Sequence, residues 1–217
     1  MFTHDPLDVR AMFISDIHLG APACQAERAI KFLQQYRPRR LYLVGDIIDS
    51  WYCHGRWPSS HARLLRMLLQ YVADKVEVVF LPGNHDAMFR NYLGQTWLGV
   101  DIVHAIVHHG VERDYLVVHG DAHDRMLWTR FLVPTWINFP RWLRRVSHWI
   151  VALGDSFEYG IIRAASQRGL TGIICGHTHL PRNDRCGEIH YLNCGDWMEN
   201  CTAVVEHIDG TMELVHG

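Results

Sequence analysis

The sequence lacks several features that would place it among secreted or membrane proteins. Its six cysteines include no CxxC pair, so the chain indicates neither a disulfide framework nor a thiolate metal site. No apolar run approaches the roughly 18 residues needed to cross a bilayer. The N-terminal residues MFTHDPLDVR lack the basic and then apolar segments of a signal peptide. Together these absences predict a cytoplasmic protein with reduced thiols.

The sequence also lacks an excess of charge of either sign. Its 21 Lys and Arg side chains nearly balance 23 Asp and Glu side chains, which leaves a formal net charge of −2. Such a balance gives no general electrostatic reason to bind nucleic acid, and we expect no nucleic-acid partner. The 217 residues, 48% of them apolar, suit one domain with one substantial core. We therefore expect a single domain over residues 1–217.

Histidine, by contrast, is abundant at 16, and several histidines follow short β-branched runs. These runs predict strands at residues 11–15, 41–44, 76–81, 115–118 and 172–175. Amphipathic stretches at about 24–36 and 60–73 predict helices that cover the sheet, since Leu64, Leu65, Leu68, Tyr71 and Val72 share one helical face. The alternation of strands and helices indicates an α/β fold.

The polar side chains that follow the predicted strands form a candidate metal site. Loops at the carboxyl ends of strands share one edge of an α/β sheet, so residues far apart in the sequence converge there. Glycines beside these side chains indicate tight turns or close backbone approach, and they are Gly45, Gly83, Gly120 and Gly176. The candidate ligands are Asp16, His18, Asp46, Asn84, His119, His177 and His179.

These blocks, DIH, GDIID, GNHD, HGD and GHTH, resemble in order the pattern of the calcineurin-like metallophosphoesterases over residues 11–205. The resemblance implies a four-layer αββα sandwich of two mixed sheets, with the site at their edge. It also implies two divalent ions bridged by Asp46. In that pattern Asp16, His18 and His179 complete the ligands of the first ion, and Asn84, His119 and His177 those of the second. The resemblance favours Mn(II), and the mixed oxygen and imidazole donors also suit Fe, Zn or Mg.

Two residues beside these ligands are candidates for catalysis. His85 follows a ligand directly, and in the family pattern this histidine binds the phosphoryl group or protonates the leaving oxygen. Asp86 either holds the second nitrogen of that imidazole or caps the helix that follows. Among the other acids, Asp121 is the stronger candidate to orient a ligand histidine. Asp49 and Asp124 are weaker, because an acidic residue after a strand is more often a turn or capping residue.

Residues 125–153 differ from the rest of the chain. They hold five arginines, no acidic residue and half of the eight tryptophans. This composition predicts a helical cap insert at about residues 123–165 that faces an anionic membrane or an acyl chain. Ordinary helices packed on the core are the alternative. The candidate substrate-binding residues are Phe131, Arg141, Trp142, Arg144 and Arg145.

The insert, with GDSFEY at 154–159 and NCGDWME at 193–199, is similar to the family branch that contains UDP-2,3-diacylglucosamine hydrolase. That branch releases UMP from a lipid-linked nucleotide sugar, which implies a peripheral enzyme at the inner face of the membrane. Its best-known members carry arginine where this chain has His85. The alternative is therefore a general phosphodiesterase or phosphatase of the same family. A non-catalytic scaffold is the third hypothesis, and the complete ligand set counts against it.

Overall fold

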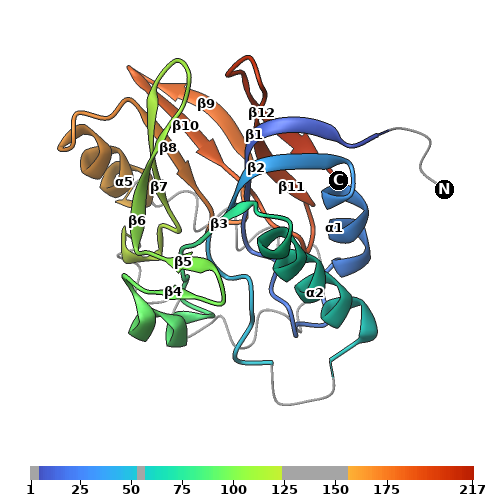
Figure 1. Cartoon of the computed structure of the whole chain (residues 1–217). Coiled ribbons are helices and arrows are strands. Elements are labelled where there is room, and N and C mark those ends of the chain that lie inside the picture. The colour runs from blue at the N-terminus through green and yellow to red at the C-terminus, as the bar shows by residue number, and fades with distance from the viewer. Residues whose placement is uncertain (1–4, 53–56, 124–155) are drawn as a thin grey trace.

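The computed structural model describes residues 5–52, 57–123 and 156–217, which form two mixed sheets and flanking helices (Figure 1). The larger sheet contains, in spatial order, β12 (Met212–His216), β11 (Thr202–Glu206), β1 (Leu7–Ile14), β2 (Tyr36–Leu43), β3 (Glu77–Phe80), β5 (Val100–Ile102) and β4 (Thr96–Trp97). The smaller contains β6 (Ala105–His109), β7 (Asp114–Val118), β8 (Gly172–Cys175), β10 (Ile189–Asn193) and β9 (Arg182–Cys186). The helices are α1 (Ala26–Leu33), α2 (Ser59–Ala73) and α5 (Ser156–Ser166), with 3-10 turns η1 (Ala87–Tyr92) and η2 (Asp121–His123).

The predicted strands are all present, but they divide between the two sheets. β1, β2 and β3 are parallel neighbours in the larger sheet, whereas β7 and β8 form a parallel pair in the smaller one. The two predicted helices correspond to α1 and α2. On α2, Leu64, Leu68 and Tyr71 are buried on the predicted face. The ligand-bearing loops therefore come from two sheets rather than from one sheet edge.

The side chains of β1 show how the layers are built, because a strand places successive side chains on opposite faces. Met12 and Ile14 enter a core shared with α1 and α2, while Ala11 and Phe13 enter a second core between the sheets. A third core, which includes Ile161, joins the smaller sheet to α5. In Figure 1, α1 and α2 lie on one side of the sheets and α5 on the other. The order helix, sheet, sheet, helix confirms the predicted four-layer sandwich.

The expected cap insert falls mostly outside the described residues. Residues 124–155 are not among them, and neither are the predicted substrate contacts Phe131, Arg141, Trp142, Arg144 and Arg145. The end of the expected range is α5, which packs on the smaller sheet through Phe157 and Ile161. Among the described helices, none combines the length and apolarity that crossing a membrane requires.

Candidate metal centre

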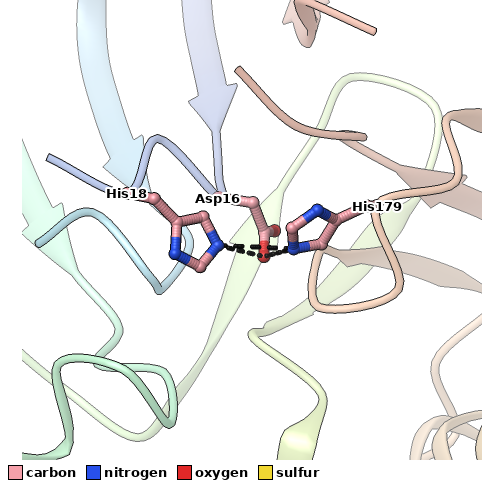
Figure 2. Close-up of side chains that lie close together, drawn as sticks. All are labelled: Asp16, His18 and His179. Atoms are coloured by element: carbon pink, nitrogen blue, oxygen red, sulfur yellow. Dashed lines mark hydrogen bonds and ion pairs between the residues drawn. The ribbon is translucent and has the colours of Figure 1, made fainter. Parts of the chain in front are cut away.

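The loops after β1 and β8 bring a first group of predicted ligands together across the two sheets. The donor atoms of Asp16, His18 and His179 lie within 4.8 Å of one another. Figure 2 shows both rings turned toward the Asp16 carboxylate. Nε2 of His179 is 3.1 Å from Oδ1 of Asp16, and Nε2 of His18 is 3.8 Å from the same oxygen. The two ring nitrogens are 3.3 Å apart, a spacing that two lone pairs tolerate only with a proton or cation between them.

Asp46, at the end of β2, connects this group to a second one. It forms one close cluster with His119 and His177, and another with His18 and His85. Oδ2 of Asp46 lies 3.4 Å from Nε2 of His119 and 4.0 Å from Nε2 of His18. A carboxylate between two imidazole clusters is the arrangement by which a bridging ligand holds two ions.

Apart from the imidazole–carboxylate approaches given above, three of the predicted ligand atoms are buried without a hydrogen-bond partner among the described residues. They are Oδ1 of Asp16, Oδ1 of Asn84 and Nε2 of His119. A buried polar atom without a partner costs about 1–3 kcal/mol, so three at one place are unfavourable unless a ligand satisfies them. All three offer lone pairs and belong to a mixed oxygen and imidazole donor set. The residues therefore fit a divalent metal centre.

Outer hydrogen bonds determine which ring nitrogen faces the centre. Nδ1 of His18 lies 3.0 Å from Oδ2 of Asp49, and Nδ1 of His119 lies 2.9 Å from the carbonyl oxygen of Val44. Carboxylate and carbonyl oxygens only accept, so each Nδ1 carries a proton and donates it. The Nε2 lone pair of each neutral ring is then directed inward, as metal coordination requires.

Without a bound cation, the charges at the centre favour a protonated His119 beside an ionised Asp46. Burial alone lowers the pKa of His119, but Asp46 and Asp16 outweigh it and raise that pKa to about 10. Burial alone raises the pKa of Asp46, but His119, His85 and His18 hold it well below its usual range. A divalent cation bound here would therefore replace the protons on the imidazoles as the positive charge that stabilises the ionised carboxylates.

The backbone at the centre is strained. Five of the seven predicted ligands have a positive φ, between 51° and 69°: Asp16, His18, Asp46, His177 and His179. Residues other than glycine rarely adopt this conformation, and it persists where the surroundings fix it. Here the two strand ends hold each other, because the N–H of Asp16 donates to Gly45 O at 3.0 Å and that of His18 to Asp46 O at 2.9 Å.

Two of the predicted glycines let ligand side chains approach the backbone. A Cβ at Gly83 would lie 2.2 Å from Oδ1 of Asp46, and a Cβ at Gly176 would lie 2.5 Å from Oδ2 of Asp16. Both distances are far below van der Waals contact. Each glycine therefore makes room for a carboxylate of the centre.

A model of the calcineurin-like phosphoesterases matches residues 9–181, a range that contains all seven predicted ligands and His85. The chain belongs to the calcineurin-like phosphoesterase family. Members of this family use divalent metal ions. The protein is accordingly a metal-dependent phosphoesterase, and the buried donor set described above supplies the side chains that such chemistry needs.

Curated relatives of this calcineurin-like phosphoesterase are named UDP-2,3-diacylglucosamine hydrolase. One from Xanthomonas axonopodis pv. citri is 28% identical and covers 89% of each chain. One from Proteus mirabilis is 25% identical and covers 93% of this chain and 92% of its own. One from Porphyromonas gingivalis is 29% identical over 52% of this chain, which in that match spans about half of the relative, 46% of its length.

Solved structures share the fold at low sequence identity. An archaeal phosphodiesterase superposes with a TM-score of 0.53 at 12% identity, covering 94% of this chain and 98% of its own. A phosphoesterase from E. coli gives a TM-score of 0.50 at 18% identity, covering 94% and 97%. At these identities the likeness is one of fold.

His85 lies within the centre of this phosphoesterase, and Asp49 holds it there. Nδ1 of His85 is 3.0 Å from Oδ2 of Asp49, the oxygen that also accepts from His18. The Trp51 ring packs against the His85 ring with centroids 3.9 Å apart. Asp49 thus fixes two imidazoles at once, although the sequence made it only a weak candidate. The sequence feature that could have predicted this role is the position of Asp49 in GDIID, on the same loop as Asp46.

Asp86 makes neither of the contacts predicted for it. Its carboxylate accepts from the backbone N–H groups of Gly83 at 2.6 Å, Ile47 at 2.8 Å and Ile48 at 3.3 Å. Its side chain does not cap η1, and within the described ranges no hydrogen bond joins it to the His85 ring. The orienting contact belongs to Asp49 instead. Asp86 ties the loop after β2 to the loop after β3, where burial and Asp46 raise its pKa to about 7.

Asp121 also does not orient a ligand. Its carboxylate pairs with Nη2 of Arg90 at 2.7 Å, while the outer nitrogen of His119 is taken by Val44. Arg90 donates in addition to the carbonyl oxygen of Pro82 at 3.2 Å. Asp121 therefore fastens η1 to the loop after β7. Asp124 lies outside the described residues.

Proposed function

We propose that this phosphoesterase hydrolyses the pyrophosphate bond of UDP-2,3-diacylglucosamine, releasing UMP and a diacylglucosamine 1-phosphate. The observation that carries the proposal is the match of relatives bearing that name over 89% and 93% of the chain. It is supported by a donor set that lacks no member of the predicted pattern. We further propose two Mn(II) ions, with Fe, Zn and Mg as metals that the same donors accept.

In this proposal each residue has a distinct role. Asp46 would bridge the ions, the group around Asp16 would hold one of them, and Asn84 with the His119 group would hold the other. Bound divalent ions supply Lewis acidity at the phosphoryl oxygens. His85, held through Nδ1 by Asp49, directs its other nitrogen at the reacting phosphate and gives a proton to the leaving oxygen.

The acyl chains are assigned to the insert. Its aromatic and basic composition suits a lipid-linked substrate, and Phe131, Arg141, Trp142, Arg144 and Arg145 stay the proposed contacts. We place the enzyme in the cytoplasm, at the inner face of the membrane, as one domain with a cap insert at about 123–165.

The test is direct. Purified, Mn-loaded protein is incubated with UDP-2,3-diacylglucosamine, and phosphorus NMR follows the appearance of UMP. Asp46→Ala should abolish both metal binding and turnover, because it removes the side chain shared by the two clusters. Folded, metal-loaded parent protein that releases no UMP would exclude this substrate.

His85 favours a second candidate, a phosphodiesterase or phosphatase of broader specificity, because the best-known hydrolases of the branch carry arginine at this position. Broad turnover of bis-p-nitrophenyl phosphate, with no gain in kcat/KM when acyl chains are added to the substrate, would support this candidate. A steep dependence on acyl chains would support the lipid-linked substrate.

A further inference from the structure

Large apolar side chains are concentrated in one short exposed segment. Of the eleven large hydrophobic residues exposed in the described part of the chain, five fall within residues 88–98. Leu98 is 71% exposed, Met88 59% and Trp97 48%. Single exposed apolar residues are ordinary, but a contiguous group indicates an interaction surface. We call this group the apolar rim, and it comprises Met88, Tyr92, Leu93, Trp97 and Leu98.

An apolar groove lies beside the rim. Its volume is about 220 Å³, and all thirteen residues that line it are apolar. Leu69 of α2 lines it together with Phe89 of η1 and the rim residues Trp97 and Leu98. Ile47 and Ile48 also line it, and they directly follow the bridging aspartate in the sequence. The groove and the catalytic centre are thus neighbours.

Charge is distributed in a way that suits an anionic lipid surface. Residues 91–99, NYLGQTWLG, are all exposed and contain no charged side chain of their own, and Thr96 donates to the Asp101 carboxylate on the neighbouring strand β5. α2 contains no acidic residue, and although its Arg63 pairs with Glu27 of α1, exposed Arg66 lies one turn before Leu69. Tyr92 and Trp97 stack with centroids 5.2 Å apart. Trp and Tyr favour the membrane interface, and nearby cations are attracted to anionic headgroups.

The rim is held in place rather than loosely attached. Gly94 N–H donates to Ile102 O at 2.8 Å, and Ile102 N–H donates to Gln95 O at 3.0 Å. Leu98, the most exposed large hydrophobic residue in the described part of the chain, has a φ of 51°, a conformation that leucine rarely adopts. An ordered backbone that turns a strained leucine toward solvent indicates that this surface binds something other than the chain itself.

We propose that the apolar rim and its groove dock onto an anionic phospholipid bilayer. Trp97 and Leu98 enter the boundary between headgroups and acyl chains, and Arg66 faces the headgroup phosphates. Residues 91–99 contain no charged side chain, and α2 contains no acidic one. This favours a lipid surface over a protein partner, because the edge of a protein–protein interface is ordinarily polar. Docking in this orientation places the metal centre next to the membrane.

The experiment is vesicle flotation with no substrate present, using mixed phosphatidylethanolamine and phosphatidylglycerol. The test variant is Leu98→Asn with Trp97→Ser, since asparagine tolerates positive φ and preserves the loop. The control is Ile208→Asn, which removes an equally apolar, 48% exposed side chain from the turn between β11 and β12. We expect the parent and the control to float equally, and the double variant to partition about tenfold less.

Turnover of bis-p-nitrophenyl phosphate should be equal in all three proteins, which shows that the variants are folded. Equal flotation of the double variant and the parent, or a parent that does not float, overturns the proposal. So does a concentration-dependent dimer that the double variant abolishes, because the rim would then bind a second copy. Substrate is absent from the assay, so its result is independent of whether the enzyme releases UMP.

Discussion

At the scale of single residues, Asp49 orients both a candidate metal ligand, His18, and the candidate catalytic residue, His85. One carboxylate oxygen accepts from Nδ1 of both His18 and His85, at 3.0 Å each. Asp49→Ala should therefore weaken Mn(II) binding by about 10–100-fold, because His18 loses the partner that fixes its tautomer. The rate should fall further than metal occupancy explains, since His85 is released as well. Calorimetric titration with Mn(II) and turnover at saturating metal measure the two effects separately.

Asp121→Ala is the matched control for this prediction. Asp121 is also an acid placed just after a ligand-bearing strand, yet its carboxylate contacts Arg90 and no ligand ring. We expect its Mn(II) affinity to stay close to that of the parent. Equal losses in the two variants would mean that negative charge near the centre matters, and not the hydrogen bonds of Asp49.

At the scale of elements, the sequence was most informative where a strand ends. Apolar β-branched runs predicted the strands, and the polar residues that follow them predicted which side chains come together as candidate ligands, because burial and metal binding demand different side chains. The division of these strands between two sheets was implied only by the family resemblance, since β1 and β7 have the same local pattern. The role of Asp49 could not be predicted from the sequence, because it depends on how the rings of His18 and His85 are oriented in space.

The glycine turns between the strands and the candidate ligands give a prediction at this scale. Gly83→Ala should displace Asp46, because the added Cβ would meet Oδ1 of Asp46 at 2.2 Å. The carboxylate proposed to bridge the ions would then move, and we expect metal affinity to fall at least tenfold, which is about 1.4 kcal/mol. Mn(II) titration measures the loss.

Gly187→Ala provides the comparison for Gly83→Ala. A Cβ at Gly187 meets nothing within 4 Å, although its φ of 61° makes alanine unfavourable there. The comparison variant should lose some stability and keep its metal affinity. A Gly83→Ala protein with parental affinity would show that the loop after β3 moves without cost.

At the scale of the whole molecule, the centre depends on how the two sheets are held together, because its candidate ligands come from both. Away from the candidate metal centre, a buried polar bridge joins the sheets. Nδ1 of His108, on β6, is 3.0 Å from the Tyr42 hydroxyl on β2, and Nε2 of His108 is 3.0 Å from Glu206 on β11. Arg10 approaches the Glu206 carboxylate at 3.2 Å. The bridge fixes how the two sheets are positioned relative to each other. The apolar side chains of the shared core specify that position less strictly.

This bridge predicts a pH-dependent contribution to stability. Burial alone raises the pKa of Glu206, but His108 and Arg10 outweigh it and hold the pKa below its ordinary value of 4.5. A carboxyl whose pKa is depressed by folding stabilises the protein above its unfolded pKa, and that contribution is lost as pH falls through the folded pKa. Glu206→Gln should therefore lower the free energy of unfolding at pH 7 by about 1–3 kcal/mol. The difference from the parent should narrow below about pH 4.5.

Urea unfolding of metal-free protein at pH 7 and at about pH 3.5 measures this effect without interference from metal release at acid pH. Glu213→Gln is the control, because Glu213 also pairs with a histidine, His207, but its side chain is 55% exposed. An exposed pair is screened by solvent and contributes at most about 1 kcal/mol. If Glu206→Gln and Glu213→Gln behaved alike at both pH values, the bridge would not stabilise the contact between the sheets, and the apolar core alone would align the two halves of the metal centre.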